Sequence, residues 1–594
     1  YMEAVTFNAG LFDAPGTRRA REIILRFRVL RGLRAELDAG LASGALSPSA
    51  AAALLVDQVG MSADEAAGEV ANALADPVQE SSYAVGRDQI FRFLVAAQAA
   101  DAALTLRDFN DRLELDGNLP ISLRLHEAGI SKLPPSLTNL HTAFPGVPTA
   151  HVPVLATAPD RVWALPGVPP PSLAGASPTM FSGYVDVTAD RSLFYLLVHS
   201  TAVDATSSTD EQSTPIVVWL QGGNGCSSMI GAFSENGPFY STDGVNLASN
   251  ADGWHTFAHM LYLDRPAGAG FSFSRSGNFS SFANDWQTAR DTMAQIKGVL
   301  RKHSWLCGRK IFVAGESYAG HFVVQLATLL ADDGAGLCSN LGGVLAGNAV
   351  VDINQTNFAW FENGATHALV PDETWTALRD SCNFAGDLGI DGNGCPSSQP
   401  SACRAAISLW FNQSGAGSGA LSLYDYYSPA TCPSAGLDSI GMDSPCIDSR
   451  TELYLNRADV RAALHVADAA PPQWTGCSDA LNDAYNCTDT LVSVVSLYTA
   501  LRSRGVPVLV YSGDVDGIVP TKASQRWVDG TGEQSSWRPW FYDGALAGYT
   551  YNVADGSGNS LAFATVKGAG HMVPRFKSSA ALVLAKRFVS GLAL

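Results

Sequence analysis

The chain has 594 residues, of which 46% are hydrophobic and 16% are charged. This composition is too apolar and too weakly charged for an intrinsically disordered protein, and the length allows roughly three or four domains of about 150 residues. The 56 acidic and 38 basic residues give a net charge of −18, which would repel phosphate backbones and argues against nucleic acid as a partner.

The first 143 residues are predicted to form an all-α region. Apolar residues recur at helical spacing over residues 23–37, and seven arginines between residues 18 and 34 occupy much of the remaining surface. Ser47-Pro48 has the pattern of an N-cap followed by the first helical position, and residues 62–65 have the S-x-x-E spacing of a capping box. We interpret the arginines as a solvated helix face, in preference to a docking face for an anionic partner.

A proline-rich connector is predicted at residues 144–180, where nine of the 30 prolines lie, because such a segment cannot continue helices. No run of the sequence approaches the ~20 apolar residues that span a bilayer, so no membrane span is predicted. The chain starts at Tyr1 without the features of a signal peptide. If the protein is secretory, we expect its signal to have been removed by processing.

Residues 181–594 alternate short β-branched runs with helical stretches. This alternation predicts an α/β domain with a largely parallel sheet that is covered by helices on both faces. Residues 363–450 break the rhythm with Gly, Ser, Asp and five cysteines, and we predict an inserted cap there. The predicted strands are 216–220, 260–264, 311–314, 344–346, 506–511 and 563–566, and the clearest predicted helices are 285–303 and 318–330.

The cysteines and glycosylation sequons indicate an oxidising compartment. All ten cysteines lie at or beyond Cys226, in the part of the chain that carries four sequons. We therefore expect several disulfides and a location in the secretory pathway, in a lysosome or vacuole or outside the cell. The candidate glycosylation sites are Asn278, Asn354, Asn412 and Asn486.

No metal centre and no other cofactor is predicted. The cysteines show neither C-x-x-C nor Cys/His zinc spacing. His255 and His259 stand four residues apart, as two ligands on one helix face would, but no acidic third ligand has suitable spacing.

The segment GESYAG at residues 315–320 places a serine between a predicted strand and a predicted helix. On such a sharp turn the hydroxyl of Ser317 would project above the sheet edge, as in a nucleophile elbow. The backbone N–H groups that follow, at a helix N-terminus, can stabilise a developing oxyanion. Ala319 replaces the second glycine of G-x-S-x-G, and a Ser/Gly-rich N-cap is the alternative interpretation of this motif taken alone.

An acid and a histidine follow two further predicted strands. Asp514 and Asp516 come just after the strand that ends at Tyr511, and His571 comes just after the strand 563–566. Open α/β sheets place their sites at the carboxyl ends of strands, and the order serine, acid, histidine is that of α/β-hydrolases. These placements favour a hydrolase triad over isolated turn or cap residues.

Six ordered motifs resemble those of serine carboxypeptidases, and the resemblance extends from about residue 160 to the C-terminus. WLQGGNGCSS is similar to the WLNGGPGCSS element of that family. The resemblance implies an α/β-hydrolase fold with an inserted cap. The motifs are WLQGGNGCSS (219–228), DRPAGAGF (264–271), GESYAG (315–320), YLNRADVRAALHV (454–466), YSGDVDGIVP (511–520) and GAGHMVP (568–574).

The resemblance also implies roles for individual residues. Ser317 would be the nucleophile and His571 the general base and then acid, and Asp516, rather than the other aspartate, would orient His571. The backbone N–H groups of Gly223 and Tyr318 would form the oxyanion hole.

The terminal carboxylate of a peptide or protein substrate would be held by Gln221, Glu235 and Glu316, beside Trp219. Two carboxylic acids bind a third carboxylate without repulsion only when they share protons. We therefore expect a carboxypeptidase that is most active at acidic pH. The family-like disulfides would be Cys226–Cys477 and Cys432–Cys446.

Two residues depart from the family pattern. Gln221 replaces an asparagine, which adds a methylene, and Asn224 replaces a proline, which removes a fixed φ from the loop. Plant acyltransferases on this scaffold also vary that loop, so an acyltransferase is the alternative enzyme. An inactive carboxypeptidase-like binding or structural module is the third interpretation, although the complete triad and the unchanged Glu316 favour a peptidase.

Residues 1–145 have no counterpart in a carboxypeptidase catalytic domain. TFNAGLF (6–12) and LRDFNDRLELDGNLP (106–120) resemble the C-terminal helices of an uncharacterised helical family related to zinc peptidases, but the H-E-x-x-H-like zinc element of that family is absent. The resemblance implies a scaffolding or partner-docking remnant, or one product of a longer precursor. A helical propeptide that covers the active site is the alternative.

Overall fold

A computed structural model of the chain describes residues 41, 46–59, 66 and 70, and residues 160–594 except 164, 169–177, 203–213, 334–336, 389–398, 433–440 and 557–558. The chain divides into two compact units, Tyr1–His151 with Pro170–Ser177 and Val152–Pro169 with Pro178–Leu594. The arginine-rich helix, the capping box at residues 62–65 and any docking role of the N-terminal region lie outside the described residues and stay predictions. Among the described residues, no helix has the length and apolarity that crossing a bilayer requires.

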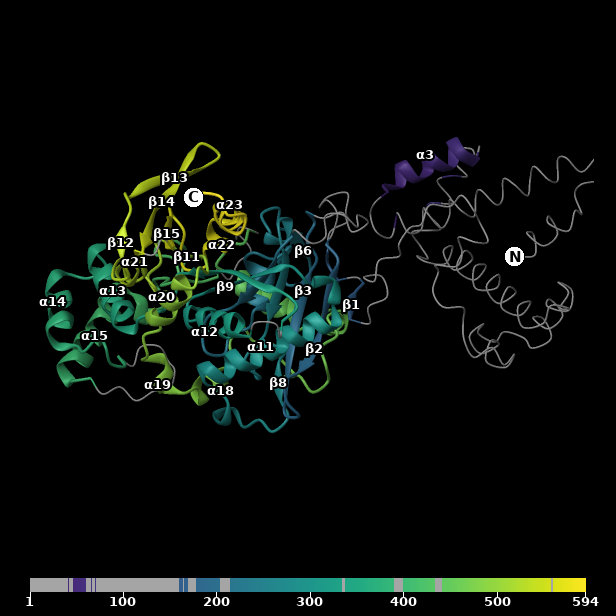
Figure 1. Cartoon of the computed structure of the whole chain (residues 1–594). Helices are drawn as coiled ribbons and strands as arrows, with labels where there is room; N and C mark the ends of the chain where they lie inside the picture. Colours follow the sequence, from purple (N-terminus) through teal and green to yellow (C-terminus); the bar gives the residue numbers. More distant parts are fainter. Residues whose placement is uncertain are drawn as a thin grey trace, which may run out of the picture. The chain divides into compact units, whose positions relative to one another are not determined.

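The described part of the first unit is helix α3 (Pro48–Val59), drawn in purple in Figure 1. The Ser47 hydroxyl oxygen accepts the N–H of Ala50 at 3.2 Å, which confirms the predicted N-cap before a proline at the first helical position. Ala51 and Leu55 on this helix are fully buried, together with Ala66.

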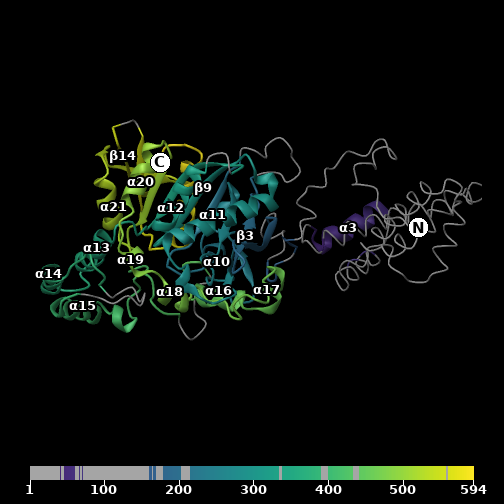
Figure 2. The same ribbon diagram turned by 60° about the horizontal axis from the view of Figure 1, so that its bottom comes forward.

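The second unit is built on a 13-stranded sheet with the order β1-β2-β3-β7-β4-β9-β10-β11-β15-β14-β12, in which β13 pairs with β14 and β8 with β3 (Figures 1 and 2). The six strands from β7 to β15 in this order run parallel, which confirms the predicted parallel core. They are β7 (His259–Leu263), β4 (Ile216–Leu220), β9 (Lys310–Glu316), β10 (Asn340–Gly347), β11 (Val508–Gly513) and β15 (Ser560–Val566).

Antiparallel strands that the sequence analysis did not predict extend the sheet at both edges. These strands are β1 (Arg161–Val162), β2 (Met180–Asp186), β3 (Arg191–Val198), β8 (Phe273–Ser274), β12 (Glu533–Gln534), β13 (Arg538–Tyr542) and β14 (Ala545–Ala554). Strands β12 and β13 are mostly exposed and form no apolar run, whereas β2 and β3 are mostly buried, and β3 was missed although it contains the apolar run LFYLLV. A separate hairpin joins β5 (Phe239–Ser241) to β6 (Leu247–Ser249).

Helices cover both faces of the sheet, and alternate residues of each central strand point to opposite faces. Along β4, Ile216, Val218 and Leu220 belong to one hydrophobic cluster, whereas Val217 and Trp219 belong to another. The first cluster packs under α11 (Asp285–Lys302), α12 (Ala319–Asp332), α20 (Val495–Ser503) and α21 (Thr521–Asp529). The second packs against α10 (Met229–Ser234), α16 (Ile447–Leu455), α17 (Ala458–Ala463), α22 (Val573–Phe576) and α23 (Ser578–Val589).

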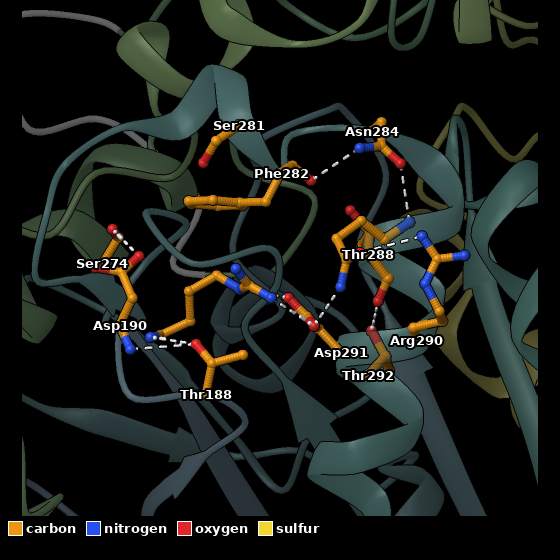
Figure 3. Close-up of polar contacts among 12 residues, drawn as sticks. Thr188, Asp190, Ser274, Ser281, Phe282, Asn284, Thr288, Arg290, Asp291 and Thr292 are labelled. Carbon is orange, nitrogen blue, oxygen red and sulfur yellow. Dashed lines mark hydrogen bonds and ion pairs between the residues drawn. The ribbon is translucent and has the colours of Figure 1, made fainter.

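Helix α11 is tied to the turn between β2 and β3. Its N-cap, Asn284, accepts the N–H of Gln287 at 2.9 Å (Figure 3). Asp291, further along the helix, accepts from Arg191 Nε at 2.7 Å and from the Gln287 amide at 2.8 Å. Arg191 also lies over the Phe282 ring, 4.9 Å from its centroid. This buried contact fixes the helix that packs beside α12.

The helices α13 (Ile353–Thr366), α14 (Asp372–Ser381) and α15 (Ser401–Ser414) share a hydrophobic cluster of their own. They lie beyond the edge of the sheet, next to α21, in both views (Figures 1 and 2). The Cys382–Cys403 disulfide joins the end of α14 to α15. The short helices α18 (Asp479–Ala484) and α19 (Cys487–Thr490) follow later in the chain.

Four disulfides join described residues, and they include the two that the resemblance implied. These are Cys226–Cys477, Cys307–Cys338, Cys382–Cys403 and Cys432–Cys446. The asparagines of all four sequons are exposed, so each is sterically accessible to a glycan.

His255 and His259 do not share a helix face, because His255 lies in a 3-10 turn (Trp254–Thr256) and His259 begins β7. The i, i+4 spacing was misleading because the chain passes from the turn directly into a strand. No group of three or more metal-binding side chains occurs among the described residues.

Candidate active site

Candidate residues from distant segments meet where five adjacent strands of the parallel core end. In the order β4, β9, β10, β11 and β15, these strands are followed by Gln221, Ser317, Asn348, Asp516 and His571. Because parallel strands end at the same sheet edge, residues far apart in sequence become neighbours there.

Ser317 lies on the sharp turn between β9 and α12. Its φ of +60° is in the left-handed region that a residue with a side chain seldom adopts. The surrounding hydrogen bonds hold this conformation, because the Ser317 N–H donates to Gly347 O at 3.0 Å and its carbonyl accepts from Gly320 and Val350 at 2.9 Å each. The loop after β4 passes so close that a Cβ on Gly222 would lie 2.4 Å from Ser317 Cβ.

The imidazole of His571 is oriented by a buried carboxylate. His571 Nδ1 lies 2.8 Å from Asp516 Oδ2, and both side chains are almost fully buried. Since Nδ1 is engaged by the carboxylate, Nε2 is the ring nitrogen left for proton transfer. The main chain also holds this residue, because the His571 N–H donates to Tyr424 O at 2.7 Å.

Asp516 is fixed in turn by a residue that the sequence analysis missed. Asn348 Nδ2 donates to Asp516 Oδ2 at 2.6 Å, and the backbone N–H groups of Ile518 and Val519 donate to Oδ1 at 2.8 and 3.2 Å. The only signal was the position of Asn348 directly after a predicted strand. Asp514 is used differently, since it accepts the Gly568 N–H at 2.6 Å.

Two buried carboxyl groups meet around the amide of Gln221. Gln221 Nε2 donates to Glu235 Oε1 at 3.1 Å and to Glu316 Oε1 at 2.7 Å, while its oxygen accepts from Trp219 Nε1 at 3.1 Å. The extra methylene of glutamine, compared with asparagine, therefore does not prevent the amide from reaching both glutamates. The remaining oxygens, Glu235 Oε2 and Glu316 Oε2, are buried and accept no hydrogen bond from another described residue, and the two carboxyl groups can hydrogen-bond to each other when one is protonated.

Burial makes these two carboxyl groups weak acids. It raises the pKa of Glu235 to about 7. Burial, together with the nearby charge of Glu235, raises the pKa of Glu316 well above its ordinary value. At acidic pH both groups are therefore protonated and can act as hydrogen-bond donors.

Ser317 opens onto two cavities. The larger one, about 390 Å³, is lined by Gln221, Gly223, Glu316 and His571 among others, whereas the smaller one, about 250 Å³, is lined by Tyr318 and by uncharged residues of α13. Both are lined by Ser317, Gly223 and Tyr424. Trp219 and Glu235 line neither cavity and contact Gln221 from behind.

The two cavities differ in charge. The larger one is lined by Asp443, Asp448, Glu452 and Arg575 in addition to Glu316 and His571. Arg575 Nη1 lies 3.0 Å from both carboxylate oxygens of Asp448, which leaves an excess of negative charge from Asp443 and Glu452. The described residues that line the smaller cavity include no Asp, Glu, Lys, Arg or His.

The predicted oxyanion-hole residues Gly223 and Tyr318 line the smaller cavity together with Ser317. Gly223 has a φ of +65° and precedes Cys226, whose disulfide with Cys477 anchors the loop. Tyr318 is the N-cap residue of α12, and its hydroxyl donates to buried Asp285 at 3.1 Å. The arrangement brings together a hydroxyl, an oriented imidazole and backbone N–H groups, which are the groups that acyl transfer requires.

Comparisons with known proteins agree with this chemistry. The family described as serine carboxypeptidase matches residues 170–591. A family described as a bacterial protein of unknown function matches residues 1–124. Serine carboxypeptidase-like 46 of Arabidopsis thaliana is 35% identical over 453 residues, which cover 73% of this chain and 92% of that protein. Serine carboxypeptidase 24 of the same plant is 32% identical, with the same coverage.

Among solved structures, the prohormone-processing carboxypeptidase Kex1Δp of Saccharomyces cerevisiae matches with a TM-score of 0.59 at 21% identity. The match covers 72% of this chain and 94% of that one. The fold of residues 178–594 is therefore the α/β-hydrolase fold that the sequence predicted.

A single methyl group on Gly222 is expected to disable the site. In Gly222→Ala the new Cβ would lie 2.4 Å from Ser317 Cβ and 2.6 Å from Glu316 O, so the loop must move away from the serine. We expect labelling of Ser317 by a fluorophosphonate to slow by at least about tenfold. Gly530→Ala is the control, because its Cβ would meet only ordinary contacts at 3.5 Å or more. Equal labelling of both variants would contradict the expectation.

Proposed function

The chain belongs to the serine carboxypeptidase family, and we propose that it is a serine-type carboxypeptidase that hydrolyses the last peptide bond of peptides or proteins through an acyl-enzyme. The observation that carries the proposal is the juxtaposition of two chemistries in one cavity. Ser317 and His571 line the same cavity as Glu316, which Gln221 joins to Glu235.

Acylation would use the nucleophile and its base. Ser317 Oγ attacks the carbonyl carbon of the last peptide bond while His571 Nε2 takes the hydroxyl proton. The carbonyl electron pair moves onto oxygen, where the N–H groups of Gly223 and Tyr318 stabilise the negative charge. The C–N bond then breaks, and His571 returns the proton to the leaving amine. A water molecule, deprotonated by His571, hydrolyses the ester in the same way.

Carboxylate recognition would select the last bond of the chain. Glu316 lines the larger cavity, whereas Glu235 lies behind it and hydrogen-bonds to Gln221 and Glu316. A protonated glutamate can donate a hydrogen bond to a substrate carboxylate, whereas an ionised one would repel it. The C-terminal residue would then occupy the larger cavity and the preceding residue the smaller one. The disulfides and exposed sequons support a secretory, vacuolar, lysosomal or extracellular location.

The central test is the release of C-terminal residues from N-blocked dipeptides near pH 5, together with fluorophosphonate labelling. Ser317→Ala is expected to abolish both, and Asp516→Asn to lower kcat by about 10⁴-fold because the imidazole loses its orienting acceptor. Asp514→Asn is the matched control, since Asp514 contacts the Gly568 backbone. Labelling with transfer to an added alcohol instead of hydrolysis would favour an acyltransferase. Absence of labelling would contradict both enzymes and favour an inactive module.

The activity is expected to decline as pH rises. The raised pKa values mean that both glutamates are protonated at acidic pH and that Glu235 loses its proton as pH rises through about 7. Binding of the substrate carboxylate should therefore be strongest at low pH, and KM should rise by up to about tenfold per pH unit above that value. The measurement is KM from about pH 4 to 8. A C-terminally amidated peptide is the control, because it carries no carboxylate; equal profiles for the two substrates would refute this role.

The charge of the larger cavity is expected to favour a basic C-terminal residue. Asp443 and Glu452 lie on its lining, and its walls of Ile230, Trp474 and Phe576 suit the alkyl stem of Lys or Arg. We expect kcat/KM for a C-terminal Arg to exceed that for Glu by about fivefold to tenfold, and Glu452→Gln to reduce the ratio severalfold. Glu533→Gln, on exposed strand β12, should leave the ratio unchanged. A ratio that Glu452→Gln does not alter would contradict the assignment.

A further inference from the structure

Arg265 is a buried cation that the proposed mechanism does not use. Its side chain has no exposed surface, and its guanidinium lies over the ring of Phe322 on α12, 4.4 Å from the ring centroid. Its Nη2 donates to the main-chain carbonyl of Gln221. Its Nε and Nη1 have no hydrogen-bond partner in the described structure.

The neighbouring acid, Asp264, makes its hydrogen bonds elsewhere, although its charge favours the Arg265 cation. Asp264 Oδ1 accepts from Ser227 Oγ at 2.6 Å and from Ser228 N at 2.9 Å, and Oδ2 accepts the Phe271 N–H at 2.9 Å. Burial lowers the pKa of Arg265 to about 10, so the side chain remains a cation at the pH at which the enzyme is proposed to work. A buried cation with unsatisfied donors costs free energy. Stability alone would favour an apolar side chain at this position.

Segment 263–265 holds the site loop, residues 221–228, at both ends. At the first end, Arg265 donates to Gln221 O. At the second end, Ser228 Oγ donates to Leu263 O at 2.6 Å, and Asp264 accepts from the two serines described above. Ser228 Oγ also accepts the Gln221 N–H at 3.1 Å, so the two ends of the loop are hydrogen-bonded to each other.

The glycines between these anchors need an external constraint. Gly222 and Gly223 have the widest backbone freedom of any residues, and Asn224 lacks the ring that would fix φ in a proline. Gly223 must still present its N–H to the oxyanion position, and Gln221 must present its amide to the glutamates. The carbonyl that Arg265 binds belongs to the peptide between Gln221 and Gly222, directly before this stretch.

We propose that Arg265 is a positioning residue for the oxyanion loop, which fixes the Gln221–Gly222 peptide and thereby aims the Gly223 N–H at the oxyanion. The inference rests on the proposed function for the role of that N–H. Arg265 does not touch the substrate, and it acts only through the loop.

Replacement by methionine separates positioning from general stability. Arg265→Met keeps an unbranched side chain of similar length but removes every donor. We expect kcat per active site to fall by about tenfold to a hundredfold, since loss of an oxyanion-hole donor costs 10²–10³ and a displaced donor is expected to cost less. A peptide aldehyde, which mimics the tetrahedral state, should bind more weakly by a similar factor. KM for the parent dipeptide should change by less than kcat does.

Arg309→Met is the matched control. Arg309 is also buried, donates to a main-chain carbonyl (Thr214 O, 3.0 Å) and lies near an aromatic ring (Trp305), but it precedes β9 at the end opposite Ser317. The control should lower thermal stability without changing kcat. Arg265→Lys retains a cation and a donor and should give an intermediate kcat. Methylguanidinium should restore part of the activity that Arg265→Ala loses and should leave the kcat of the Arg309→Met control unchanged.

The rate of fluorophosphonate labelling keeps this inference distinct from the proposed peptidase activity, because the tetrahedral adduct also places an oxygen in the oxyanion hole. If the wild type is labelled but releases no amino acid, the peptidase proposal fails, while slower labelling of Arg265→Met still supports positioning. The positioning role would be overturned if Arg265→Met kept the kcat and the labelling rate of the wild type. It would also be overturned if Arg309→Met lost as much kcat and labelling rate as Arg265→Met. A wild-type protein that cannot be labelled would overturn both proposals.

Discussion

The close approach of the site loop to the turn at Ser317 is the constraint on which the rest of the site depends. The Gly222 backbone lies where a Cβ would be 2.4 Å from Ser317 Cβ, while Ser317 itself is held at a φ of +60°. A residue in a strained conformation and a close approach that only glycine permits are therefore packed against each other. They are sustained by the parallel sheet beneath, by hydrogen bonds from segment 263–265 and by the Cys226–Cys477 disulfide. The local strain brings backbone N–H groups from two segments to one point.

Burial gives the glutamate pair a chemistry that exposed glutamates lack. In water Glu235 and Glu316 would be ionised at mildly acidic pH and would repel any substrate carboxylate. Placed beneath Gln221 and cut off from solvent, their pKa values rise, and they become neutral donors within the same pH range. Gln221 Nε2 uses both of its protons on this pair, so the amide orders the glutamates, and Glu316, which lines the larger cavity, is the one that a ligand would meet.

The sequence predicted the parts of this structure that local patterns determine. The six parallel strands are continuous apolar runs, and the strand-end positions of Ser317, Asp516 and His571 followed from them. Asn348 and Arg265 could not be found in this way, because each acts through a contact across the sheet edge that no local pattern records. Asn348 reaches Asp516 from 168 positions away, and Arg265 reaches Gln221 from 44 positions away. Among the antiparallel strands, β1, β8 and β12 were missed because they are only two residues long, whereas β3 was missed although it is a buried apolar strand.

Tyr424, in the segment 363–450 that the sequence predicts to be a cap, contacts the catalytic candidate His571. The Tyr424 carbonyl accepts the His571 N–H, and its ring packs edge-on against the imidazole at a centroid distance of 5.3 Å. The same residue lines both cavities beside Ser317. A substrate whose last two residues occupy the two cavities would therefore have Tyr424 beside its scissile bond. A movement of Tyr424 would change the lining of both cavities and displace the backbone partner of His571, so this residue connects substrate fit with the orientation of the base.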